Sequence, residues 1–87
     1  MLISERPIVT SAQIRAARAM LRWSAETLAD NAKVSLPTVQ RIESVEGLPA
    51  GRNTTLFQIV KILEAAGIQF IGGPNDAPGV RLQDKAD

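Results

Sequence analysis

Residues 28–43, LADNAKVSLPTVQRIE, contain the end of one apolar helical pattern and the start of another. On both sides of the link 33–35 the apolar residues recur at the three- and four-residue spacing of an amphipathic helix. The pattern predicts two helices, at about 24–32 and 35–44, joined by a turn of only a few residues.

The residues at the start of the second helix would allow its first turn to approach another surface closely. Ser35 is a favourable N-cap, and Pro37 lies within the first turn, where its missing N–H costs little. A turn this short makes the helices cross steeply, and only a small residue such as Ala29 fits where they come closest. This arrangement is typical of a helix-turn-helix, whose second helix enters the major groove of DNA. The residues left facing outward are Leu36, Pro37, Thr38, Gln40 and Arg41.

Two further helices are expected on either side of this pair. One begins near Thr10 or Ser11, which are both good N-caps. The other begins at Asn53 or Thr54, has an apolar side along its length, and ends before Gly67, a residue type that commonly follows a helix.

The C-terminal part of the chain changes character. The segments 68–71, IQFI, and 79–82, GVRL, are short and β-prone, and residues rich in Gly and Pro separate them. This pattern predicts a short β-hairpin or strand pair. The chain is thus divided into an N-terminal arm at 1–9, either loose or a short strand, a helical DNA-binding domain at 10–67, and a β-prone tail at 68–87.

The composition excludes several classes of function. The chain of 87 residues has neither cysteine nor histidine, so it lacks thiolate metal ligands, disulfides and the usual general base. We therefore expect no enzyme activity, no cofactor and no metal site. No apolar run approaches the roughly 20 residues of a membrane span, and no secretory signal is evident. This predicts a soluble, cytoplasmic protein without membrane association.

The net charge of +1 is unevenly distributed. Residues 11–61 contain seven basic and four acidic residues, whereas residues 62–87 contain two basic and four acidic residues. A mildly basic helical region is a weak indication of nucleic-acid binding, well short of the signal given by a strongly basic domain.

Over about residues 11–67 the sequence resembles the Cro/C1-type (XRE-family) helix-turn-helix transcriptional regulators. The residues that carry the resemblance are Leu28, Ala29, Val34, Ser35, Thr38, Val39, Ile42 and Glu43, followed by TLFQIVKILEAAG at 55–67. The resemblance implies a mainly α fold, a lambda-repressor-like bundle of four to five helices, here followed by the short C-terminal β-hairpin. It also implies a sequence-specific DNA-binding regulator of bacterial or phage type, most simply a repressor that occupies its operator.

The resemblance further implies roles for individual residues. The helix at 35–44 would read bases, while phosphates would be held at the starts of helices and in the loop before residue 53. The expected base contacts are Leu36, Pro37, Thr38, Gln40 and Arg41. The expected phosphate contacts are Ser24, Ala25, Ser35, Arg52, Asn53 and Thr54. Arg18 and Glu43 are expected to form a structural ion pair.

The side chains of the second helix suit base readout. Arg41 can donate two hydrogen bonds to guanine, and Gln40 can recognise adenine. Leu36 offers no hydrogen bond and can only pack on a thymine methyl. The alternative for each is an ordinary surface side chain.

Two residues depart from the family's pattern. Lys33 occupies a turn position usually held by glycine, and a left-handed conformation there would cost a residue with a Cβ about 1 kcal/mol. Ala25 stands where a polar residue is common, so only a backbone N–H or Ser24 could bind a phosphate at that helix start.

Double-stranded DNA is the expected partner, and the tail suggests another. The open edge of a hairpin invites a further strand, so we expect a homodimer formed through the C-terminal tail. The alternative is a hairpin that folds back onto its own helices and leaves a monomer. Two other functions stay open: an antitoxin with the same DNA-binding fold, whose tail wraps a toxin partner, and a protein-interaction module that has lost DNA binding.

Overall fold

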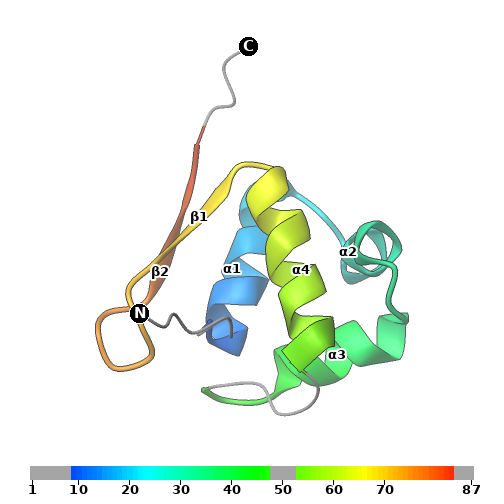
Figure 1. The fold of residues 1–87 in the computed structure, drawn as a ribbon, viewed down its shortest axis with the longest axis horizontal. Helices are drawn as coiled ribbons and strands as arrows, with labels where there is room; N and C mark the ends of the chain where they lie inside the picture. The colour runs from blue at the N-terminus through cyan, green and yellow to red at the C-terminus, as the bar shows by residue number, and fades with distance from the viewer. Residues whose placement is uncertain (1–8, 48–52, 84–87) are drawn as a thin grey trace.

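The computed structural model describes residues 9–47 and 53–83, which form helices and a two-stranded antiparallel sheet (Figure 1). The elements are α1 (Ser11–Leu21), α2 (Ala25–Ala32), α3 (Leu36–Ser44), α4 (Asn53–Ala65), β1 (Ile68–Ile71) and β2 (Gly79–Leu82). The mainly helical class and the strand pair are confirmed, and each helix begins within about a residue of its predicted start. Among the described residues, no helix has both the length and the apolar character needed to cross a membrane.

Serine and threonine side chains set the first three helix starts. Thr10 forms a capping box with Gln13, in which each side chain bonds the other residue's backbone N–H. Ser24 and Ser35 accept hydrogen bonds from the backbone N–H of Thr27 and Thr38, at 3.0 and 3.2 Å. These contacts are local, which is why the sequence located the helix starts closely.

Both α1 and α2 end in a residue with left-handed backbone conformation. Arg22 has φ 60° and Lys33 has φ 61°. After α2, Val34 N donates to Ala29 O at 3.0 Å and Lys33 N donates to Asp30 O at 3.3 Å, the paired bonds of a Schellman motif. The expected left-handed Lys33 is therefore present, and with it the steric penalty of its Cβ.

The core is built from one apolar face of every helix and the start of β1. Its buried side chains are Val9, Ile14, Ala17, Leu28, Ala29, Ala32, Val39, Ile42, Leu56, Ile59, Val60, Leu63 and Ile68. In Figure 1 the hairpin flanks α1 on one side of the molecule, α2 lies beyond α4 on the other side, and α3 crosses at one end.

The prediction that Val9 belongs to a loose arm or short strand is wrong. Val9 is only 5% exposed and belongs to the core, although it lies outside any strand. It directly precedes the N-cap Thr10, and the buried Ile14 occupies the fourth helical position. These are the two positions of a hydrophobic staple, which fixes how the chain enters a helix. Residues 1–8 of the expected arm lie outside the described part of the chain.

The hairpin packs on the helices of its own chain. Its register pairs Ile68 with Leu82 and Phe70 with Val80, so these side chains share one face of the sheet. Ile68 at one end is 3% exposed and enters the core, whereas Leu82 is 43% exposed. β1 lies against α4 and β2 against α1. This is the packing expected if the hairpin folds back onto the helices of its own chain, which was the alternative to a dimer formed through the tail.

A single buried side chain ties α1 to the hairpin. Gln13 is 2% exposed, and its Nε2 donates to the carbonyl oxygens of Ile71 and Gly79, at 3.0 and 2.9 Å. The amide oxygen of Gln13 meanwhile accepts from Thr10 N at 2.9 Å. One residue therefore completes the cap of α1 and holds together the end of the strand pair.

Replacing Lys33 with glycine is expected to stabilise the protein by about 1 kcal/mol, because glycine adopts the left-handed conformation without a Cβ clash. For a domain of this size that corresponds to a rise in melting temperature of about 4–8 °C. The matched control is Lys61→Gly at an exposed position inside α4, where loss of helix propensity lowers the melting temperature. A melting temperature that falls in both variants would contradict the strain assigned to Lys33.

Replacing Gln13 with glutamate is expected to lower the free energy of unfolding by about 2–3 kcal/mol. The carboxylate can still accept from Thr10 N, but it has no N–H for the carbonyls of Ile71 and Gly79. Urea unfolding measures the loss, and amide hydrogen exchange should accelerate in β1 and β2 more than in α2 and α3. Gln69→Glu, at an exposed position on β1, should change stability by no more than about 0.5 kcal/mol. Equal stability of the two variants would show that the Gln13 contacts do not hold the hairpin.

Candidate nucleic-acid interface

The helices α2 and α3 pack against each other and are joined by residues 33–35. Ala29 is 2% exposed, and the inner faces of both helices are buried. Figure 1 shows α2 almost end-on and α3 lying across the view, so the two helices cross steeply. The short link and the steep crossing therefore agree with the sequence prediction, and Ala29 is buried as a small residue of α2.

One face of α3 is exposed along its whole length. Pro37, Gln40, Arg41 and Ser44 are all exposed and recur at the three- and four-residue spacing of one helical face. We call these residues the α3 stripe. Leu36 and Thr38, the other expected base contacts, lie at its border and are half-buried, Leu36 being packed against the core.

The opposite side of α3 is held by an ion pair with α1. The guanidinium of Arg18 donates to both carboxylate oxygens of Glu43, each at 2.9 Å, and also to Trp23 O at 3.0 Å. The Arg18 side chain is 25% exposed and that of Glu43 8%. The hydrogen bonds to Glu43 raise the pKa of Arg18 above its usual value despite partial burial. The expected Arg18–Glu43 pair thus joins α1, the turn after it and the end of α3.

Other side chains donate hydrogen bonds to the backbone carbonyl groups at the C-terminal end of α3. Ser11 Oγ donates to Ile42 O at 2.6 Å, Arg15 Nη1 donates to Glu43 O, and Ser44 Oγ donates to Arg41 O at 2.9 Å. Such terminal carbonyls have no partner inside the helix, and a cation is favourable at a helix C-terminus.

Sequence reasoning missed this use of Ser11 and Arg15. From the sequence, Ser11 is a candidate helix cap, and Arg15 has no expected partner. Ser11, Arg15 and Arg18 are spaced by four and three residues and so share a face of α1. That spacing was the available signal, but it did not identify the carbonyls on α3 as the partner.

The expected phosphate contacts differ in how exposed they are and in whether their side chains already have hydrogen-bond partners. Ser24, Ser35 and Thr54 are exposed, and Ala25 is half-buried. The hydroxyls of Ser24 and Ser35 already accept from backbone N–H groups, and each bonds a threonine hydroxyl, Thr27 at 2.9 Å and Thr38 at 2.7 Å. Arg52 and the side chain of Asn53 lie outside the described part of the chain, and Asn53 opens α4.

An acidic side chain stands next to one of these proposed contacts. Glu26 is exposed in the first turn of α2, directly after Ala25. A carboxylate is favourable at a helix N-terminus, but it repels a phosphate that approaches the same N–H groups.

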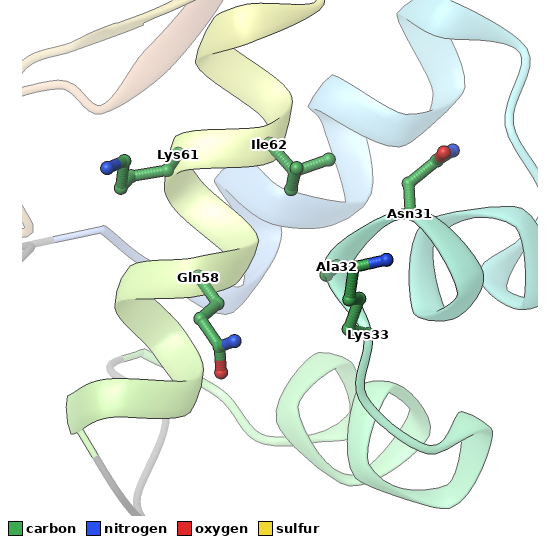
Figure 2. Close-up of a pocket in the computed structure, with 6 residues that line it drawn as sticks. All are labelled: Asn31, Ala32, Lys33, Gln58, Lys61 and Ile62. Carbon is green, nitrogen blue, oxygen red and sulfur yellow. The ribbon is translucent and has the colours of Figure 1, made fainter.

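A shallow hollow of about 240 Å³ lies between the end of α2 and α4, away from the α3 stripe (Figure 2). It is lined by Asn31, Ala32, Lys33, Gln58, Lys61 and Ile62. Figure 2 shows Ile62 pointing across it toward α2, whereas Lys61 extends away from it. None of the predicted contact residues lines it, and among the described residues no cluster of acidic side chains is suited to a metal ion.

Comparison of the sequence with models of protein families gave no match, and no curated protein is significantly similar to it.

Replacing Arg18 with lysine is expected to lower the free energy of unfolding by about 2–3 kcal/mol, because lysine keeps the charge but loses the two-pronged bond to Glu43 and the bond to Trp23 O. Arg22→Lys, at an exposed position in the same turn, is the matched control and should be nearly neutral. Urea unfolding of both variants measures the difference. Equal stabilities would show that charge alone, without the fork geometry, holds α1 to α3.

Proposed function

We propose that this protein is a sequence-specific DNA-binding transcriptional regulator with a lambda-repressor-like helix-turn-helix, acting as a cytoplasmic repressor that occupies its operator. One observation carries the proposal: the α3 stripe is exposed while the other side of α3 is fixed to α1 by the Arg18–Glu43 pair. A helix presented in this way can enter a major groove without rearrangement of the domain.

The α3 stripe supplies side chains suited to base edges. Within the described residues, the side chains of Gln40 and Arg41 make no hydrogen bond or ion pair, so neither must give up a partner to bind DNA. Arg41 suits guanine O6 and N7, and Gln40 suits adenine N6 and N7. The mildly basic region 11–61 favours approach to phosphates, which fix register rather than sequence.

A second copy of the chain would strengthen this recognition. One α3 spans only a few base pairs, whereas two joined copies read half-sites about one helical turn, or roughly 34 Å, apart. Because Ile68, Phe70 and Val80 on the apolar face of the hairpin pack against the core of their own chain, we assign the dimer contact to an open strand edge. An antitoxin with this fold would offer the same edge to a toxin protein.

One observation favours a second candidate, a protein-interaction module. Ala25 and the exposed Glu26 make the start of α2 a weaker place for phosphate than a polar or basic pair would be. A module of this kind would not bind random duplex DNA even at low salt, where electrostatic binding of a regulator is strongest. A mobility-shift assay on random duplex at low salt therefore separates the two candidates.

Selection of bound duplexes from a random pool, followed by affinity measurement, tests the α3 stripe directly. Changing Gln40 and Arg41 together to alanine should weaken binding to the selected duplex at least about 30-fold, since each two-bond base contact contributes about 1–3 kcal/mol. The matched control removes one glutamine and one arginine away from both α3 and the hairpin: Gln58 is exposed on α4, and Arg22 is exposed directly after α1. An equal loss in both double variants, or none in either, would contradict readout by α3.

A further inference from the structure

The first residue of the α3 stripe, Pro37, has an apolar side chain. Pro37 is exposed, its ring has no polar side-chain atom, and it has no backbone N–H. Beside it, the hydroxyls of Ser35 and Thr38 bond each other at 2.7 Å, and Thr38 N donates to Ser35 Oγ. The Ser35 and Thr38 hydroxyls on either side of Pro37 are thus bonded to each other, and Pro37 itself contributes an apolar ring to this surface.

A base edge placed against Pro37 cannot gain a hydrogen bond from that side chain. Most groups on base edges in the major groove are donors or acceptors, and covering them without a partner is unfavourable. The thymine methyl is the exception, because it gains from apolar contact. We propose that Pro37 packs on the 5-methyl group of a pyrimidine, so that the operator of this protein contains a methyl-bearing base at a defined position. This inference rests on the proposed DNA-binding function.

The geometry of the α3 stripe also limits where that base lies. Gln40 and Arg41 follow Pro37 by three and four residues on the same helical face, which is about 4.5–6 Å along the helix axis. Successive bases are about 3.4 Å apart along a strand. The methyl-bearing base should therefore lie within about two base steps of the purines that Gln40 and Arg41 contact.

The proposed contact of Pro37 depends on the methyl group of the base and not on the other groups of thymine. Uracil has the same hydrogen-bonding edge as thymine but lacks the methyl, and 5-methylcytosine adds the same methyl to a different base. Contact with Pro37 should therefore make binding sensitive to methylation of cytosine at this one position.

The test uses the full chain and a duplex selected from a random pool, in which each thymine is replaced in turn by uracil. The variants of Gln40 and Arg41 first identify the purines that these two side chains contact. One thymine-to-uracil replacement within about two base steps of those purines should then weaken binding about fourfold. This is the factor expected for the loss of one buried methyl group. At that same position, 5-methylcytosine should bind about fourfold more tightly than cytosine.

A protein variant then tests whether the side chain of Pro37 makes the methyl contact. Pro37→Ser keeps a favourable residue in the first turn of α3 but removes the apolar ring, so it should bind the thymine and uracil duplexes equally. Pro78→Ser, at an exposed position in the hairpin loop, is the matched control and should keep the fourfold difference. Circular dichroism of both variants checks that the helices remain folded.

The outcomes separate the two proposals. Tight binding of the selected duplex with no uracil-sensitive position overturns the methyl contact and leaves DNA binding in place. A fourfold effect that persists in Pro37→Ser also overturns it, because another side chain then covers the methyl. Failure of the unmodified protein to bind any duplex at low salt removes both the regulator function and this inference.

Discussion

The position of α3 depends on side chains of α1 that hold its C-terminal end. Arg18 binds the Glu43 carboxylate through two hydrogen bonds, and Ser11 and Arg15 donate to the backbone carbonyls of Ile42 and Glu43. Two cations therefore lie where the partial negative charge of a helix end favours them. These contacts hold α3 from the side opposite its exposed stripe and use none of the residues on that stripe.

The helix α1 organises the domain through three different faces. Ile14 and Ala17 are buried in the core, and the face that carries Arg18 meets α3. Gln13 reaches the hairpin. A chain this short buries limited apolar surface, and apolar contacts have little directionality. Hydrogen bonds from α1 therefore supply the orientation that a small core cannot, and they also order a hairpin that would be marginal alone.

The compact links between helices make this arrangement possible at some conformational cost. Arg22 and Lys33 both adopt the left-handed conformation at helix ends, where glycine would be unstrained. The bonds from Trp23 N and Val34 N back to the preceding helices close both ends tightly. The second link brings Ser35 directly to the start of α3, and so the proposed base and methyl contacts depend on the same strained turn.

The sequence by itself determined which segments form helices and strands and that Pro37, Gln40 and Arg41 of α3 face outward. Those properties follow from local capping at Thr10, Ser24 and Ser35 and from apolar spacing, which act over a few residues. Only the tertiary structure decided the partners of Ser11, Gln13 and Arg15, which lie 28 to 66 residues away along the chain, and the burial of Val9. The spacing of Ser11, Arg15 and Arg18 identifies a shared face, but a polar side chain in a sequence does not show which distant backbone carbonyl lies within its reach. That distance is set by how the apolar faces of all the helices pack together, and the packing is a property of the whole domain.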